Sequence, residues 1–82
     1  MIVTYKYIGI PLKELSFKIH EIEIKDNADI FELLERIIEK YNTINLEYLK
    51  KCSFMVNNKK ADESTYLNEG DNILILKTLG GG

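Results

Sequence analysis

The sequence is poor in the residues that build covalent or metal-linked scaffolds. It contains one cysteine, Cys52, one histidine, His20, and no tryptophan. A single cysteine excludes an internal disulfide, and a lone histidine without clustered partners does not predict a metal site. We therefore expect no metal and no bound cofactor, and a protein suited to the reducing cytoplasm.

Extended apolar segments and a marked excess of positive or negative residues are also missing. No apolar stretch approaches the ~20 residues that cross a bilayer, and the opening residues, MIVTYKYIGI, do not read as a signal peptide. Lys and Arg number 11 against 13 Asp and Glu, which gives a net charge of −2 without a basic block. Because phosphate binding needs a concentrated positive field, we expect neither nucleic acid nor a membrane as a partner.

The 82 residues predict one domain that begins with two strands. Residues 1–8 alternate apolar and polar-tolerant positions and are rich in β-branched and aromatic side chains, which is typical of a strand. Gly9 and Pro11 then turn the chain. Residues 16–25 predict the second strand of a hairpin.

The alternation of apolar and polar residues is interrupted in the second predicted strand. Phe17 and Ile19 would share one face, whereas Ile22 and Ile24 fall on the other. Because a period of two cannot absorb that shift without an extra residue, the pattern predicts a bulge near His20–Glu21. His20 would make a local hydrogen bond there.

A helix is predicted within residues 26–42. Asp29 is suited to cap it, and Glu32 three residues later completes a capping-box pair. Apolar residues then recur at helical spacing and predict the stripe that faces the core: Phe31, Leu34, Ile37, Ile38 and Tyr41.

The second half of the chain predicts two further strands. Residues 42–51 fit either a short helix or an irregular loop, and residues 52–58 form a strand that ends in the turn signal Asn57-Asn58. The polar segment 59–71 offers Tyr66 and Leu67 as anchors to the core. A tight turn at Gly70 leads into a densely apolar strand, NILILK, which is expected inside the sheet. The predicted class is α+β, with one sheet face under one main helix.

Cys52 has two interpretations. Lys50 and Lys51 could lower its pKa and make it reactive. The default interpretation is a small residue at a strand entrance, and the lack of a second cysteine or a nearby histidine favours it.

The last residues, KTLGGG, have no counterpart elsewhere in the sequence. Glycine lacks a Cβ, so a glycine tail fits a channel that excludes other residues. Residues 79–82 reach roughly 13 Å when extended, enough to carry the Gly82 carboxylate into another protein's active site. Leu79 could anchor this tail in a groove of the partner, with Gly80 as a spacer.

The C-terminal third of the chain resembles the MoaD/ThiS family of sulfur carrier proteins. The similarity lies in the strand that ends in VNN, in L-x-x-GD-x-I at Leu67, Gly70, Asp71 and Ile73, and in the terminal Gly81-Gly82. It implies a ubiquitin-like β-grasp fold for residues 1–78, a mixed sheet on one main helix, and a flexible tail at 79–82.

The resemblance also implies a function. Gly82 would be adenylated by an ATP-using adenylyltransferase of the ubiquitin-activating type. A sulfur donor protein would then supply the sulfur of a thiocarboxylate, with Gly81 giving a narrow approach, and a synthase subunit would accept that sulfur. The chain would be a protein co-substrate rather than an enzyme by itself.

Two features leave the pathway open between molybdopterin and thiamine synthesis. The tail KTLGGG lacks the prolines common before the glycines of molybdopterin-type carriers, whereas the chain is longer than typical thiamine carriers. A ubiquitin-like modifier conjugated to lysines through Gly82 is an alternative function. A second alternative is a β-grasp interaction module whose tail has no chemical role.

Overall fold

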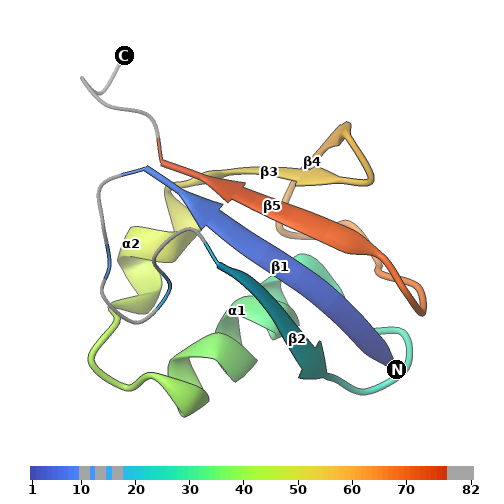
Figure 1. Ribbon diagram of the computed structural model, residues 1–82, viewed down its shortest axis with the longest axis horizontal. Coiled ribbons are helices and arrows are strands. Elements are labelled where there is room, and N and C mark those ends of the chain that lie inside the picture. Colours follow the sequence, from blue (N-terminus) through green and yellow to red (C-terminus); the bar gives the residue numbers. More distant parts are fainter. Residues whose placement is uncertain (10–11, 13–14, 16–17, 78–82) are drawn as a thin grey trace.

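The chain folds into one five-stranded sheet with two helices on one side of it (Figure 1). The computed structural model describes residues 1–9, 12, 15 and 18–77. The elements in chain order are β1 (Ile2–Ile8), β2 (Ile19–Glu23), α1 (Ile30–Lys40), α2 (Leu46–Lys50), β3 (Ser53–Val56), β4 (Lys59–Ala61) and β5 (Asn72–Leu76). This arrangement confirms the predicted α+β class.

The first and last strands lie side by side at the centre of the sheet. The strand order is β2-β1-β5-β3-β4, and β1 pairs with β5 in parallel, from Thr4 opposite Asn72 to Ile8 opposite Leu76. The other three pairings are antiparallel, so the sheet is mixed. The prediction that the last strand is internal is confirmed.

The predicted capping box begins α1. The Asp29 carboxylate accepts a hydrogen bond from the Glu32 backbone N–H at 2.9 Å, and the Glu32 side chain accepts one from the Asp29 N–H at 3.4 Å. Two N–H groups that have no partner within the helix are thereby satisfied.

The predicted core stripe of α1 is confirmed at Leu34 and Ile37, but the buried face is shifted toward Ile30 and Leu33. The buried residues are Ile30, Leu33, Leu34 and Ile37, whereas Phe31, Ile38 and Tyr41 are only partly buried. Residues 30, 33, 34 and 37 follow the same helical spacing, so the pattern alone allowed either phase. Packing against the sheet selects the observed one, and Phe31 lies beside Lys50, whose Nζ is 5.5 Å from the ring centroid.

The predicted bulge near His20–Glu21 is wrong. β2 begins at Ile19 and pairs with β1 in unbroken register, from Ile19 opposite Lys6 to Glu23 opposite Ile2. Ile19 and Ile22 lie on opposite faces of β2, and no extra residue is needed because Ile19 lies on the outer face of the sheet, where it is 71% exposed. Phe17 lies outside the described residues. The predicted local hydrogen bond of His20 is confirmed, since its Nε2 lies 3.1 Å from the Leu15 carbonyl oxygen.

The segment between β3 and β5 contains a strand that the sequence did not indicate. Asn57 and Asn58 form the predicted turn with positive φ angles of 51° and 68°, and β4 follows directly as a short edge strand. Its residues, KKA, lack apolar alternation, and lysines are typical of exposed edges. Leu67 is buried as predicted, but Tyr66 is 72% exposed and does not anchor the core.

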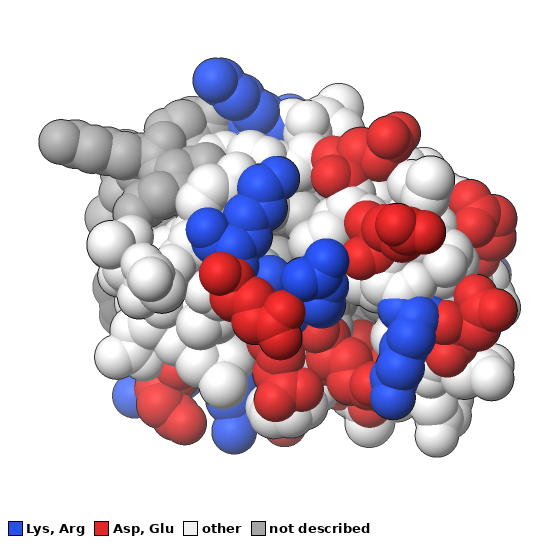
Figure 2. Space-filling view, turned by 90° about the horizontal axis from the view of Figure 1, so that it is seen from below, with Lys and Arg blue, Asp and Glu red and all other residues white. Residues whose placement is uncertain are grey.

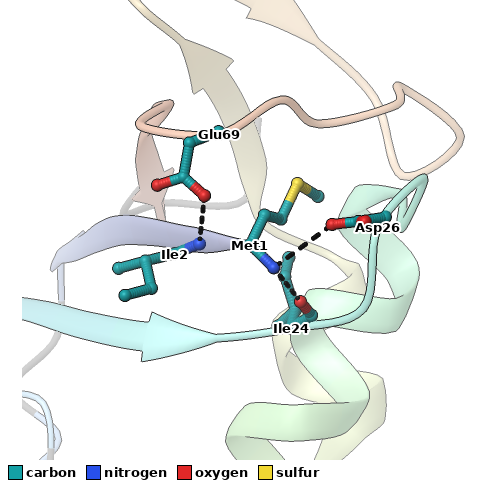
Figure 3. Close-up of polar contacts among 5 residues, drawn as sticks. All are labelled: Met1, Ile2, Ile24, Asp26 and Glu69. Carbon is teal, nitrogen blue, oxygen red and sulfur yellow. Dashed lines mark hydrogen bonds and ion pairs between the residues drawn. The ribbon is translucent and has the colours of Figure 1, made fainter.

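The start of β1 is tied to both of its neighbouring loops (Figure 3). The Met1 ammonium donates to the Ile24 carbonyl at 2.7 Å and lies 3.4 Å from the Asp26 carboxylate. The Ile2 N–H donates to the Glu69 carboxylate at 2.9 Å. These bonds hold β1 against the segment that enters α1 and the turn that enters β5.

A buried carboxylate joins the turn after β3 to the turn before β5. Asp71 is 8% exposed and accepts hydrogen bonds from the Asn57 side-chain amide at 2.9 Å and the Asn68 N–H at 2.8 Å. Asn57 also accepts from the Asn72 N–H at 2.9 Å. The VNN and GD segments, which are separate in the sequence, are therefore one hydrogen-bonded unit.

Replacing this carboxylate tests the unit. Asp71→Ala leaves the Asn57 amide and the Asn68 N–H without their acceptor, so we expect the free energy of unfolding in urea to fall by about 3 kcal/mol. Asp26→Ala is the matched control, because this carboxylate is 87% exposed and its contact with the Met1 ammonium is long. Its effect should stay within about 0.5 kcal/mol. Equal losses in the two variants would contradict the structural role of Asp71.

Candidate functional site

The C-terminal end of β5 is the place from which the predicted functional tail departs. The Lys77 N–H donates to the Ile8 carbonyl at 2.9 Å, which extends the β1–β5 ladder one residue beyond the strand. The predicted site residues Leu79, Gly80, Gly81 and Gly82, and the predicted domain boundary at residue 78, lie outside the described residues. The described part of the site is therefore the base of the tail.

Aromatic side chains support this base from the helix side of the sheet. The Lys77 ammonium lies 5.0 Å from the centroid of the Tyr48 ring, a cation–π geometry. The Tyr48 hydroxyl is 2.7 Å from that of Tyr7, a buried residue of β1. Burial, and then the bond to Tyr48, raise the pKa of Tyr7 above its ordinary value, so its hydroxyl stays protonated at neutral pH.

Cys52 is adjacent to this group and is a packed residue. Its thiol is buried and lies 3.5 Å from the Tyr48 carbonyl oxygen, to which it donates. Burial raises the pKa of the Cys52 thiol, and the charge of Lys77 offsets only part of that rise. The environment therefore favours the protonated, unreactive form, in agreement with a small residue at a strand entrance.

The outer face of the sheet, opposite the helices, carries a row of side chains that crosses all five strands. Its members are aligned by the pairing registers: Ile19, Lys6, Leu74, Met55 and Lys60. We call this set the outer row. Leu74 and Met55 are half-buried and lie between Lys6 and Lys60, whereas Ile19 is 71% exposed and lies beyond Lys6 on the edge strand β2.

The opposite side of the molecule is different in chemistry. Figure 2 shows acidic and basic side chains intermingled on the side where α1 lies. Lys25 pairs with Glu32 at 2.6 Å, and Arg36 pairs with Glu39 at 2.9 Å. Two ion pairs compensate part of the charge on this face, whereas the outer row places the apolar side chains of Ile19, Leu74 and Met55 on one surface. Apolar surface of this kind is typical of a docking site for proteins.

Two other kinds of site are absent from the described ranges. Among residues 1–9, 12, 15 and 18–77, no three His, Cys, Asp or Glu side chains gather as metal ligands would. Within the same ranges, no helix has the length and hydrophobicity needed to span a bilayer.

The sequence could not identify the outer row or Tyr48 as parts of the site. Alternation along β5 separates Leu74 from Ile73, but it does not say which of them faces the helices. Tyr48 lies in the segment that fitted either a helix or a loop. The exposed Ile19, which broke the expected alternation of β2, was the one signal of an outward-facing apolar residue.

Comparisons with known proteins bear on this geometry. A sequence model of the ThiS family matches residues 11–82. SAMP1 from Haloferax volcanii is similar in structure, with a TM-score of 0.79, 13% identity and full coverage of both chains. A chain of the complex of subunits 1 and 2 of molybdopterin-converting factor from Helicobacter pylori 26695 has a TM-score of 0.67 and 29% identity, again over both full chains.

Ubiquitin of Caldiarchaeum subterraneum matches with a TM-score of 0.62 and 11% identity, over 100% of this chain and 98% of that one. No curated protein sequence gives a significant match. The structural similarities confirm the ubiquitin-like β-grasp fold.

The environment of Cys52 predicts slow thiol chemistry. Since its raised pKa leaves less thiolate at any given pH and its sulfur is buried, alkylation by iodoacetamide at pH 8 should be at least about tenfold slower than in urea-unfolded chain. The matched control is the double variant C52A/S53C, which moves the thiol to the exposed neighbouring position. Intact mass spectrometry follows both reactions. Equal rates in the two folded proteins would show that Cys52 is accessible and ionised.

Proposed function

The chain belongs to the ThiS family, and from this premise we propose that it is a sulfur carrier that works through the carboxylate of Gly82. The observation that carries the proposal is that the family match extends through residue 82 and so includes Gly81 and Gly82. The fold supports it, because β5 ends beside β1 in a central position and its last ladder bond is made by Lys77.

The proposed chemistry takes place in a partner's active site. An oxygen of the Gly82 carboxylate attacks the α-phosphorus of ATP, and pyrophosphate leaves. A hydrosulfide-level sulfur from a donor protein then attacks the carbonyl carbon of the acyl adenylate, and AMP leaves. The product is a thiocarboxylate that passes its sulfur to a synthase subunit. ATP is consumed by the adenylyltransferase, and this chain holds no cofactor of its own.

We assign the recognition of partner proteins to the outer row. Apolar side chains on a rigid sheet, next to Lys6 and Lys60, suit a partner surface that is apolar at its centre and acidic around it. The similarity to a chain from a two-subunit complex of Helicobacter pylori supports assembly with a synthase subunit. The adenylyltransferase would dock on the same face, so the two partners would bind in turn.

Other outcomes of Gly82 activation use the same chemistry. An activated carboxylate attacked by a lysine amine gives an isopeptide bond, which is the modifier alternative. The sulfur acceptor belongs to molybdopterin or to thiamine synthesis, and the reducing cytoplasm is the compartment proposed for both. A ladder of covalent conjugates on a denaturing gel would favour the modifier over the carrier.

The direct test is an intact mass with C-terminal fragmentation of protein isolated from its own host. We expect one oxygen of Gly82 to be replaced by sulfur. Because oxidation of Met1 or Met55 gives nearly the same nominal mass change, the fragment must place the change at Gly82. The matched control carries one extra residue after Gly82, which misplaces the carboxylate and should carry no sulfur. An unmodified Gly82 that persists with ATP, sulfide and activating partners would contradict the proposal.

The outer row is tested on Ile19, its exposed apolar member. Ile19→Ser should weaken binding to the adenylyltransferase about tenfold, because a side chain that is 71% exposed here becomes buried in the complex. Ile2→Ser is the matched control, with the same exchange on the same face at the far end of β1, where Ile2 is 42% exposed. Isothermal titration measures both affinities. If the two variants lose affinity equally, the outer row is not the docking site.

A further inference from the structure

We propose that Gly9, Tyr48 and Lys77 form a clamp that sets the point and direction in which the chain leaves β5. We call these three residues the tail clamp. Its role in activation rests on the proposed function, whereas its role in fixing Lys77 does not. Gly82 is the fifth residue after Lys77, so Lys77 sets the starting point and initial direction of the short segment that carries the carboxylate.

Gly9 occupies a position in the clamp that only glycine fits. Its φ angle is +151°, a conformation that residues with a side chain rarely adopt. A Cβ added to Gly9 would lie 2.8 Å from the Lys77 Cβ, 2.8 Å from the Lys77 carbonyl oxygen and 3.2 Å from the Tyr7 hydroxyl. The first two contacts are with the backbone and the root of a side chain, which cannot rotate away. An added methyl group would therefore displace Lys77 itself.

Tyr48 is the second part of the clamp, and α2 holds it in place. The Asn45 side chain caps this short helix by accepting from the Glu47 N–H at 2.7 Å and the Tyr48 N–H at 3.3 Å. The hydroxyl contact with Tyr7 then fixes the far end of the Tyr48 ring relative to β1. The Lys77 ammonium lies over that ring, so the ring restrains its side chain while the Ile8 carbonyl restrains its N–H.

The tail clamp acts on the tail by fixing Lys77, the residue from which the tail starts. Residues 78–82 reach at most roughly 17 Å beyond Lys77, so the position of Lys77 and the direction in which the chain leaves it set the region that the Gly82 carboxylate can reach. A misplacement of about 1 Å in a reacting group costs on the order of 100-fold in rate. Gly9, Tyr48 and Lys77 are thus positioning residues, which touch no reacting atom themselves.

The first experiment needs no partner protein. Gly9→Ala should speed exchange of the Lys77 amide hydrogen about tenfold in NMR measurements, while amides of Ile73 and Ile75 keep their protection. Gly70→Ala is the matched control, because Gly70 also has a positive φ, +82°, but a Cβ there meets nothing within 4 Å. It strains the backbone at the other end of β5 and should leave the Lys77 amide unchanged. Unchanged Lys77 exchange in Gly9→Ala would overturn the clamp.

A second variant covers the case in which Gly9→Ala does not fold. Lys77→Met removes the cation from the Tyr48 ring and keeps most of the side-chain stem. Lys40→Met is its control, since it makes the same charge change and also removes a cation near a ring, that of Tyr41 at 5.5 Å. Only Lys77→Met should speed exchange at residue 77. Equal exchange in the two lysine variants would overturn the clamp.

The role in activation is measured with the adenylyltransferase by ATP–pyrophosphate exchange. Gly9→Ala and Lys77→Met should lower kcat about tenfold with KM for the carrier unchanged, because the outer row still docks. A rise in KM alone, or rates equal to those of the controls, would overturn the positioning role. Failure of the wild-type chain to support exchange would contradict the proposed function instead, and the amide measurements would still decide the clamp.

Discussion

The parallel pairing of β1 with β5 is the constraint on which the rest of the molecule depends. It joins the two ends of the described chain, from Thr4 opposite Asn72 to Ile8 opposite Leu76. Parallel neighbours cannot be joined by a tight turn, so β2, both helices, β3 and β4 all lie within the connection between them. Because the two strands run the same way, they end at the same edge of the sheet, and this brings Gly9 beside Lys77.

The same central strand separates the two faces of the sheet. Ile73 and Ile75 of β5 are buried under the helices, whereas Leu74 and Leu76 lie on the outer face and are half-buried. Side chains of a strand alternate between faces, so one apolar segment supplies both the core and the outer row. The proposed function needs both a stable core and a surface for partner proteins, and β5 contributes to each.

Hydrogen bonds between distant turns keep this arrangement in register. Asp71 and Asn57 join the entrance of β5 to the end of β3, and Glu69 joins the same turn to the start of β1. At the exit of β5 the contacts are of another kind, an aromatic ring beneath Lys77 and a glycine against its backbone. The strand is therefore held at both of its ends, and the proposed tail begins from a fixed point.

The features that could be predicted from the sequence alone depend on residues that are close together along the chain. The capping box of Asp29 and Glu32, the Asn57-Asn58 turn and the outer limits of β1 and β5 follow from local backbone chemistry. The resemblance of the terminal segment to the sulfur carriers likewise needed only consecutive residues, and the family match agrees with it.

Other features depend on residues that are distant in the sequence, and these could be seen only in the folded chain. Two phases of the α1 stripe fitted the spacing, and packing on the sheet selected Ile30 and Leu33 over Phe31 and Ile38. The outward position of Ile19 removed the need for a bulge, and β4 formed because the Asn57-Asn58 turn returned a polar segment along β3. Gly9 and Lys77 lie near opposite ends of the sequence and become neighbours only when the chain folds. No local sequence pattern predicts such a contact.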